Sequence, residues 1–84
     1  MYKLEIYVKL KKDVLDPQGK AIAKAAKSLN MKNLIEVKQG KYFEIIINNV
    51  NGVKEVKSFG NQISKKLLCN EVIEDYKIIN IKKI

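Results

Sequence analysis

Residues 2–11 read YKLEIYVKLK, so that apolar and polar side chains alternate from one position to the next. This period of two is typical of a β-strand that turns one face toward a core. Leu4, Ile6 and Val8 belong to the apolar row, and Glu5 and Lys9 belong to the opposite row. The stretch therefore predicts a strand with one buried face at the start of the chain.

Two segments that follow show the spacing of amphipathic helices. The first is predicted to begin at Asp16-Pro17, because Asp caps free N–H groups and Pro fits the first turn, and to end near Asn30. The second is predicted to begin after Asn51, a candidate cap, and to run to about Leu68. Their apolar stripes consist of Ile22, Ala25, Ala26 and Leu29, and of Val53, Val56, Phe59, Gly60, Ile63 and Leu67.

Residues 34–38 and 42–48, between the helices, have the composition of short strands. Gly40 lies between them and can adopt the positive φ of a tight turn, so a hairpin is the simplest connection. A last strand is predicted from Val72 to the end of the chain.

The order strand, helix, strand, strand, helix, strand predicts one α+β domain over residues 1–84. It closes most simply as two layers, an antiparallel sheet with both helices on one face, in the ferredoxin-like arrangement or a relative of it. In the last strand Ile78, Ile79 and Ile81 cannot all point to one face. We therefore predict that part of this apolar surface meets another chain, which makes these three residues candidates for an oligomer interface.

The composition makes most enzymatic sites improbable for this chain. It has no His, one Cys and no glycine-rich phosphate loop, and Cys69 has no base beside it. Glu74 and Asp75 are adjacent, so in a strand they point to opposite faces. No catalytic, cofactor-binding or metal-binding residue is predicted. The longest apolar run, at residues 45–47, is far too short for a membrane span, and a reducing, cytoplasmic setting fits a lone Cys best.

The formal net charge of +8 raises the possibility of a nucleic-acid partner. All 17 cationic residues are Lys, whereas guanine recognition and base stacking favour Arg. The abundance of Lys, Ile and Asn also matches what A/T-rich coding sequence produces. A small ferredoxin-like nucleic-acid-binding module with a Lys-rich surface, on which Tyr7 would stack bases, remains the alternative hypothesis.

The chain resembles the PurS family, the small subunit of phosphoribosylformylglycinamidine synthase, along essentially its whole length. The resemblance rests on Leu15-Asp16-Pro17-Gln18-Gly19 after the first strand, on Gly40-Lys41, and on the stretch from Lys66 through Asn70 to Tyr76. Glu71 stands where Pro or a small residue is expected, and Cys69 where Ala is more usual. The resemblance implies a PurS-like variant of the α+β fold.

It also implies a non-catalytic assembly subunit in de novo purine biosynthesis. Such a subunit joins a glutaminase (PurQ), which releases ammonia from glutamine, to a synthetase (PurL), and assists ammonia transfer. The complex uses ATP and Mg, whereas this subunit is expected to bind no cofactor, nucleic acid or membrane and to form a homodimer or larger assembly. Asp16, Pro17, Gln18 and Gly19 are the first candidates for partner contacts, although Asp16 and Pro17 equally suit a simple helix start.

Overall fold

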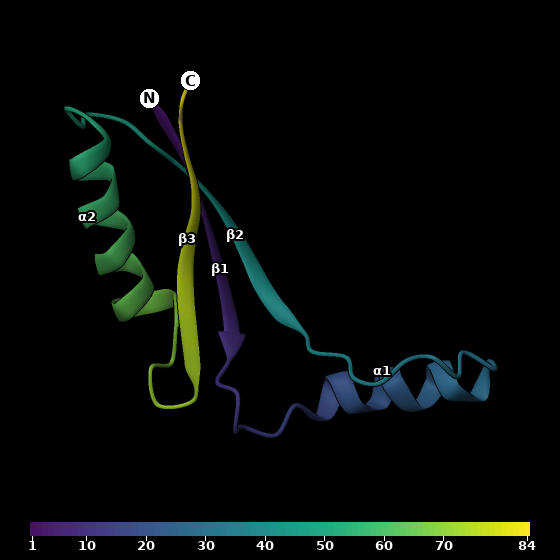
Figure 1. The fold of residues 1–84 in the computed structure, drawn as a ribbon. Coiled ribbons are helices and arrows are strands. Elements are labelled where there is room, and N and C mark those ends of the chain that lie inside the picture. The colour runs from purple at the N-terminus through teal and green to yellow at the C-terminus, as the bar shows by residue number, and fades with distance from the viewer.

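The computed structural model describes all residues from 1 to 84 and has a three-stranded antiparallel sheet (Figure 1). β1 (Tyr2–Leu10) is the central strand, between β2 (Gly40–Ile47) and β3 (Glu74–Lys83). The predicted first strand is confirmed. It lies at the centre because its apolar row, Leu4, Ile6 and Val8, is fully buried or nearly so.

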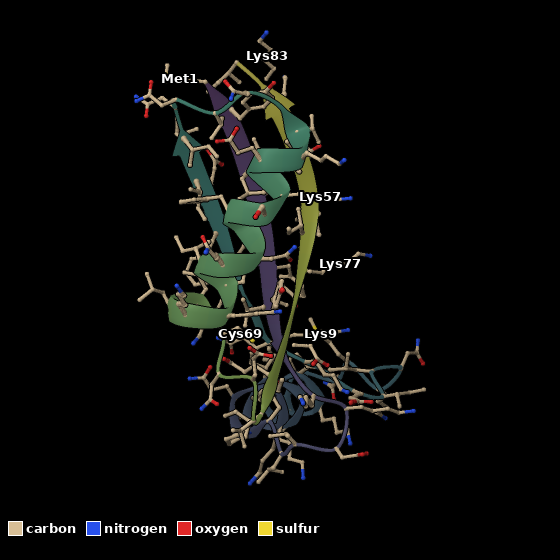
Figure 2. All side chains as sticks on the ribbon, turned by 90° about the vertical axis from the view of Figure 1, so that its left-hand side faces the viewer. Met1, Lys9, Lys57, Cys69, Lys77 and Lys83 are labelled. Atoms are coloured by element: carbon tan, nitrogen blue, oxygen red, sulfur yellow. The ribbon has the colours of Figure 1, made fainter.

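The core lies between this apolar row and α2 (Val53–Ile63), which runs lengthwise over the sheet (Figure 2). Val56 of α2 is fully buried against it. A Cβ atom on Gly60 would lie 3.0 Å from side-chain atoms of both Leu4 and Ile78, so the glycine allows the helix its close approach. The predicted α+β class with an antiparallel sheet is therefore confirmed.

The ends of this helix agree only in part with the sequence prediction. α2 continues into one turn of π-helix, η1 (Ser64–Leu68), which ends at the predicted residue. Asn51 is not the cap, because Gly52 occupies that position and no side chain caps it. Instead the Glu55 carboxylate accepts a hydrogen bond of 2.8 Å from the backbone N–H of Asn51.

The first helix, α1 (Pro17–Ser28), projects from one end of the sheet and does not lie beside α2 (Figure 1). The predicted placement of both helices on one face is thus wrong for α1, because its first turn is tied to residues 37–39 and not to the sheet. The helix ends as predicted, with Asn30 at a φ of 67°. Neither α-helix has the length and hydropathy needed to cross a membrane.

Residues 34–38 form no strand within this chain, although the sequence predicts one. None of them takes part in a backbone–backbone hydrogen bond. The predicted hairpin is also wrong, since Gly40 begins β2, pairs with Lys9 of β1 and has no positive φ. The reason is topological: α1 carries residues 34–38 away from the sheet before the chain returns at Gln39.

Candidate partner-binding site

The predicted partner-contact segment lies where α1 leaves the sheet. Asp16 caps α1, as predicted, and its Oδ1 accepts the N–H of Gly19 at 2.9 Å. Its Oδ2 accepts the N–H of Gln39 at 2.9 Å. The bonds from Gln39 and then Gly19 lower the pKa of Asp16 below its ordinary value, since they favour the charged form. One carboxylate therefore joins the start of the helix to the segment that returns to β2.

Gly19 completes this junction by close packing. It is buried, and a Cβ atom there would collide with the carbonyl oxygen of Val37. Of the four predicted contact residues, Asp16 and Gly19 therefore act inside the chain, whereas Pro17 and Gln18 are exposed. Pro17 and Gln18 line a cavity of about 230 Å³ with Gln39, Lys41 and Glu74. This pair is the part of the segment that a partner can reach.

The three isoleucines of β3 are separated by an irregularity in the strand. The pairing with β1 shifts between Glu5 and Ile6, so that Asn80 pairs with Glu5 and Ile78 with Ile6. Ile79 is the extra residue of this bulge. Ile78 and Ile81 consequently both pack against the core, while Ile79 remains 46% exposed. The bulge thus leaves Ile79 as the member of the set available to another chain.

The sheet face away from α2 is polar and internally paired. Lys3 lies 3.7 Å from Glu5 and 3.5 Å from Glu44. A hydrogen bond with Tyr42 is the main cause that lowers the pKa of Glu5 and raises that of Tyr42. Tyr7, the proposed stacking platform for bases, instead covers Gly40 and is half-buried. These contacts weaken the nucleic-acid hypothesis.

Cys69 lies at the end of the second helical segment, next to the sheet (Figure 2). It is 8% exposed, and its thiol donates a long hydrogen bond, 3.5 Å, to the carbonyl oxygen of Glu74. Burial, followed by the charge of Glu74, raises the pKa of the thiol. A protonated, buried thiol is a poor nucleophile, which agrees with the prediction of a boundary residue.

Sequence analysis missed the apolar surface of the segment from α1 to β2. Its exposed large apolar side chains include Ile22, Leu29, Met31 and Ile35. The signal was present, because Leu29 and Ile22 belong to the predicted stripe of α1. The sequence analysis assigned this stripe to the chain's own sheet, and for that reason it did not predict an exposed apolar surface on α1.

Comparison with known proteins identifies the family. A model described as PurS, phosphoribosylformylglycinamidine (FGAM) synthase, matches residues 3–82. The chain is 43% identical over 84 residues to phosphoribosylformylglycinamidine synthase subunit PurS of Methanocaldococcus jannaschii, covering 100% of this chain and 99% of that protein. It is 40% identical over 77 residues to the Bacillus subtilis subunit, covering 92% of this chain and 89% of that protein.

Solved structures agree with this assignment. Methanocaldococcus jannaschii PurS, described as one of the subunits of formylglycinamide ribonucleotide amidotransferase in the purine biosynthetic pathway, superposes with a TM-score of 0.87 at 40% identity over 100% of this chain and 99% of that one. A structure of PurLQS from Thermotoga maritima shares the fold, with a TM-score of 0.81 at 23% identity over 93% of this chain and 94% of that one. The chain belongs to the PurS family, subunits of phosphoribosylformylglycinamidine synthase in purine biosynthesis.

Proposed function

We propose that this chain is the non-catalytic assembly subunit of phosphoribosylformylglycinamidine synthase, joining a glutaminase and a synthetase subunit and assisting the transfer of ammonia between them. Family membership over nearly the whole chain supports the assignment to this enzyme. The structure from Thermotoga maritima, described as PurLQS, supports an assembly with PurL-type and PurQ-type partner subunits.

The observation that carries this proposal is the projecting arm, defined as residues 13–39. The chain has extents of 51 × 28 × 14 Å and a radius of gyration of 16.4 Å. A compact domain of this length has a radius of gyration of about 12 Å. An arm that exposes apolar side chains and lies off its own sheet suits a chain whose surfaces are completed by other subunits.

The chemistry of the side chains supports a non-catalytic role. The only thiol, Cys69, is buried with a raised pKa, and Asp16 is held by two backbone N–H groups. We therefore assign ATP and Mg to the partner subunits and expect no cofactor on this one. We further expect a homodimer or larger assembly, because the arm leaves apolar surface uncovered, and a cytoplasmic location, where a free thiol stays reduced.

Reconstitution tests the proposal. Synthesis by the purified glutaminase and synthetase is measured with glutamine and, separately, with ammonium as nitrogen source, with and without this chain. We expect glutamine-dependent synthesis to require the chain and ammonia-dependent synthesis to change much less. Equal glutamine-dependent rates with and without it would contradict the proposal.

A matched pair of variants locates the contact. Gln18→Ala changes an exposed residue of the proposed contact segment, and Lys57→Ala changes an exposed residue of α2, which Figure 2 shows far from the arm. We expect Gln18→Ala to weaken assembly with the larger subunits and Lys57→Ala to leave it unchanged.

A further inference from the structure

The loop between β2 and α2 contains the pair Asn51-Gly52. The chain has eight Asn residues, and Asn51 alone is followed by Gly. The side-chain carbonyl carbon of an Asn can close a five-membered ring with the backbone nitrogen of the next residue, and Asn is among the thermolabile residues of proteins. A side chain on the next residue crowds this approach, whereas Gly has none. The sequence therefore singles out one Asn for chemistry with its own backbone.

The structure leaves both reacting groups of this pair free. Asn51 is exposed and lies outside any helix or strand. Its side-chain amide takes part in no hydrogen bond, and the backbone N–H of Gly52 donates none. Apart from its chain neighbours, Gly52 has no atom within 4 Å of the position that a Cβ atom would take. The nitrogen and the side-chain carbonyl can therefore meet without breaking an existing contact.

Other Asn residues are held in ways that Asn51 is not. After Asn30, the N–H of Met31 is engaged, since it donates to the carbonyl oxygen of Ala26 at 3.1 Å. The side-chain oxygen of Asn70 accepts the N–H of Val72 at 3.2 Å. Every Asn other than Asn51 also precedes a residue with a side chain. Local geometry thus adds to the difference that the sequence makes.

We infer that Asn51-Gly52 is a site of spontaneous deamidation. Base removes the proton of the Gly52 N–H, and this nitrogen attacks the side-chain carbonyl carbon of Asn51. A C–N bond forms in the ring, the C–N bond of the side-chain amide breaks, and the amide nitrogen leaves as ammonia after taking a proton from solvent. The product of this step is a cyclic imide.

Water completes the reaction by opening the imide. Addition to the side-chain carbonyl gives aspartate, and addition to the main-chain carbonyl gives isoaspartate, in which the backbone runs through the former side chain. One water is consumed and one ammonia released, with no oxidation or reduction. Either product carries a new carboxylate, so each event lowers the formal net charge of +8 by one.

The two products differ in what they do to the start of α2. The Glu55 carboxylate accepts the N–H of Asn51 at 2.8 Å, and the N–H of Val56 donates to the carbonyl of Gly52 at 3.1 Å. Isoaspartate adds one backbone atom between these two anchored groups, whereas aspartate adds none. Because both bonds lead to the first turn of α2, the longer backbone cannot keep both in their present geometry. Isoaspartate therefore loosens the start of the helix.

This site is separate from the proposed contact segment. The loop before α2 lies at one end of the sheet, and α1 leaves the sheet at the other end (Figure 1). Pro17 and Gln18 are consequently untouched by the reaction. The inference does not rest on the proposed function, and reconstituted synthesis and deamidation are measured independently.

Timed incubation of the full wild-type chain, followed by peptide mapping with mass spectrometry, tests the site. We expect deamidation at Asn51 to be at least about tenfold faster than at any other Asn, and faster in mildly alkaline than in mildly acidic buffer because base generates the attacking nitrogen. Comparison with synthetic peptides should identify both aspartate and isoaspartate. Equal rates at Asn51 and at the other Asn residues would overturn the inference.

A matched pair of variants tests the ring-closing step. Gly52→Ala adds a methyl group beside the attacking nitrogen, in an extended backbone (φ 166°) with open space around it, so the fold is kept. We expect deamidation at Asn51 to slow at least about tenfold. Val53→Ala changes an exposed side chain one position further on and should leave the rate unchanged. An undiminished rate in Gly52→Ala would overturn the proposed route.

Amide hydrogen exchange tests the effect on α2. The isoaspartate and aspartate forms are separated by chromatography and compared by NMR. We expect the amide of residue 51 or of Val56 to exchange faster in the isoaspartate form than in the aspartate form, since one of the two bonds must open. Equal exchange in the two forms would show that the start of the helix absorbs the extra backbone atom.

Discussion

Asp16 and Gln39 are 23 positions apart, yet the Asp16 carboxylate accepts the backbone N–H of Gln39 at 2.9 Å. The same carboxylate caps α1 through Gly19. Because the two oxygens hold the two ends of the arm, this side chain fixes the direction in which α1 leaves the sheet.

The first prediction concerns the pH dependence of this junction. Hydrogen bonds from Gln39 and Gly19 lower the pKa of Asp16 in the folded state below its ordinary value of 3.8. A carboxyl group whose pKa is lower in the folded state than in the unfolded state stabilises the fold at pH values above its unfolded-state pKa. This stability is lost as the pH falls through its folded-state pKa. We therefore expect the Gly19 and Gln39 amides to lose exchange protection below about pH 4. In Asp16→Ala this pH step should be absent, and a step of unchanged size would contradict the assignment.

The second prediction concerns the packing of Gly19. Gly19→Ala places a Cβ atom against the carbonyl of Val37, so we expect it to destabilise the chain by about 1–3 kcal/mol in chemical denaturation. Gly52→Ala is the control, because no atom lies within 4 Å of its Cβ position. Its cost, that of a weaker helix cap, should stay below about 1 kcal/mol. Equal costs would show that the contact with Val37 is unimportant.

The third prediction concerns Cys69. Because burial raises the pKa of its thiol, we expect slow alkylation in the native protein at neutral pH and fast alkylation after unfolding. Cys69→Ala should leave glutamine-dependent synthesis by the reconstituted complex nearly unchanged. If the folded Cys69→Ala variant lost glutamine-dependent synthesis, the thiol would be needed for the reaction and this prediction would be wrong.

The fourth prediction separates the three isoleucines of β3. Ile79→Lys changes the outward residue of the bulge, so we expect a folded chain in a smaller assembly, measured by light scattering. Ile78→Lys places an unpaired charge against the core and is expected to prevent folding. An unchanged mass for the Ile79 variant would remove this residue from the oligomer interface.

The amino-acid sequence alone determined the local structure. The alternation of apolar and polar residues predicted β1 and its buried row. Asp16-Pro17 and Asn30 predicted the two ends of α1, and the order of the elements predicted the α+β class. These features follow from backbone geometry within a few neighbouring residues, so a periodic pattern is enough to predict them. The prediction that the lone Cys69 is a boundary residue had a different basis, because it followed from the absence of a base beside it in the sequence.

Only the tertiary structure decided where these elements lie. The hydrogen bond from Gln39 to Asp16 and the contact of Gly19 with Val37 join residues far apart in sequence, and they turn α1 and residues 34–38 away from the sheet. The bulge at Ile79 likewise depends on register with β1. A hydrophobic pattern indicates which side chains will be buried. It does not indicate whether this chain or another chain buries them, because removing apolar surface from water is favourable in both cases.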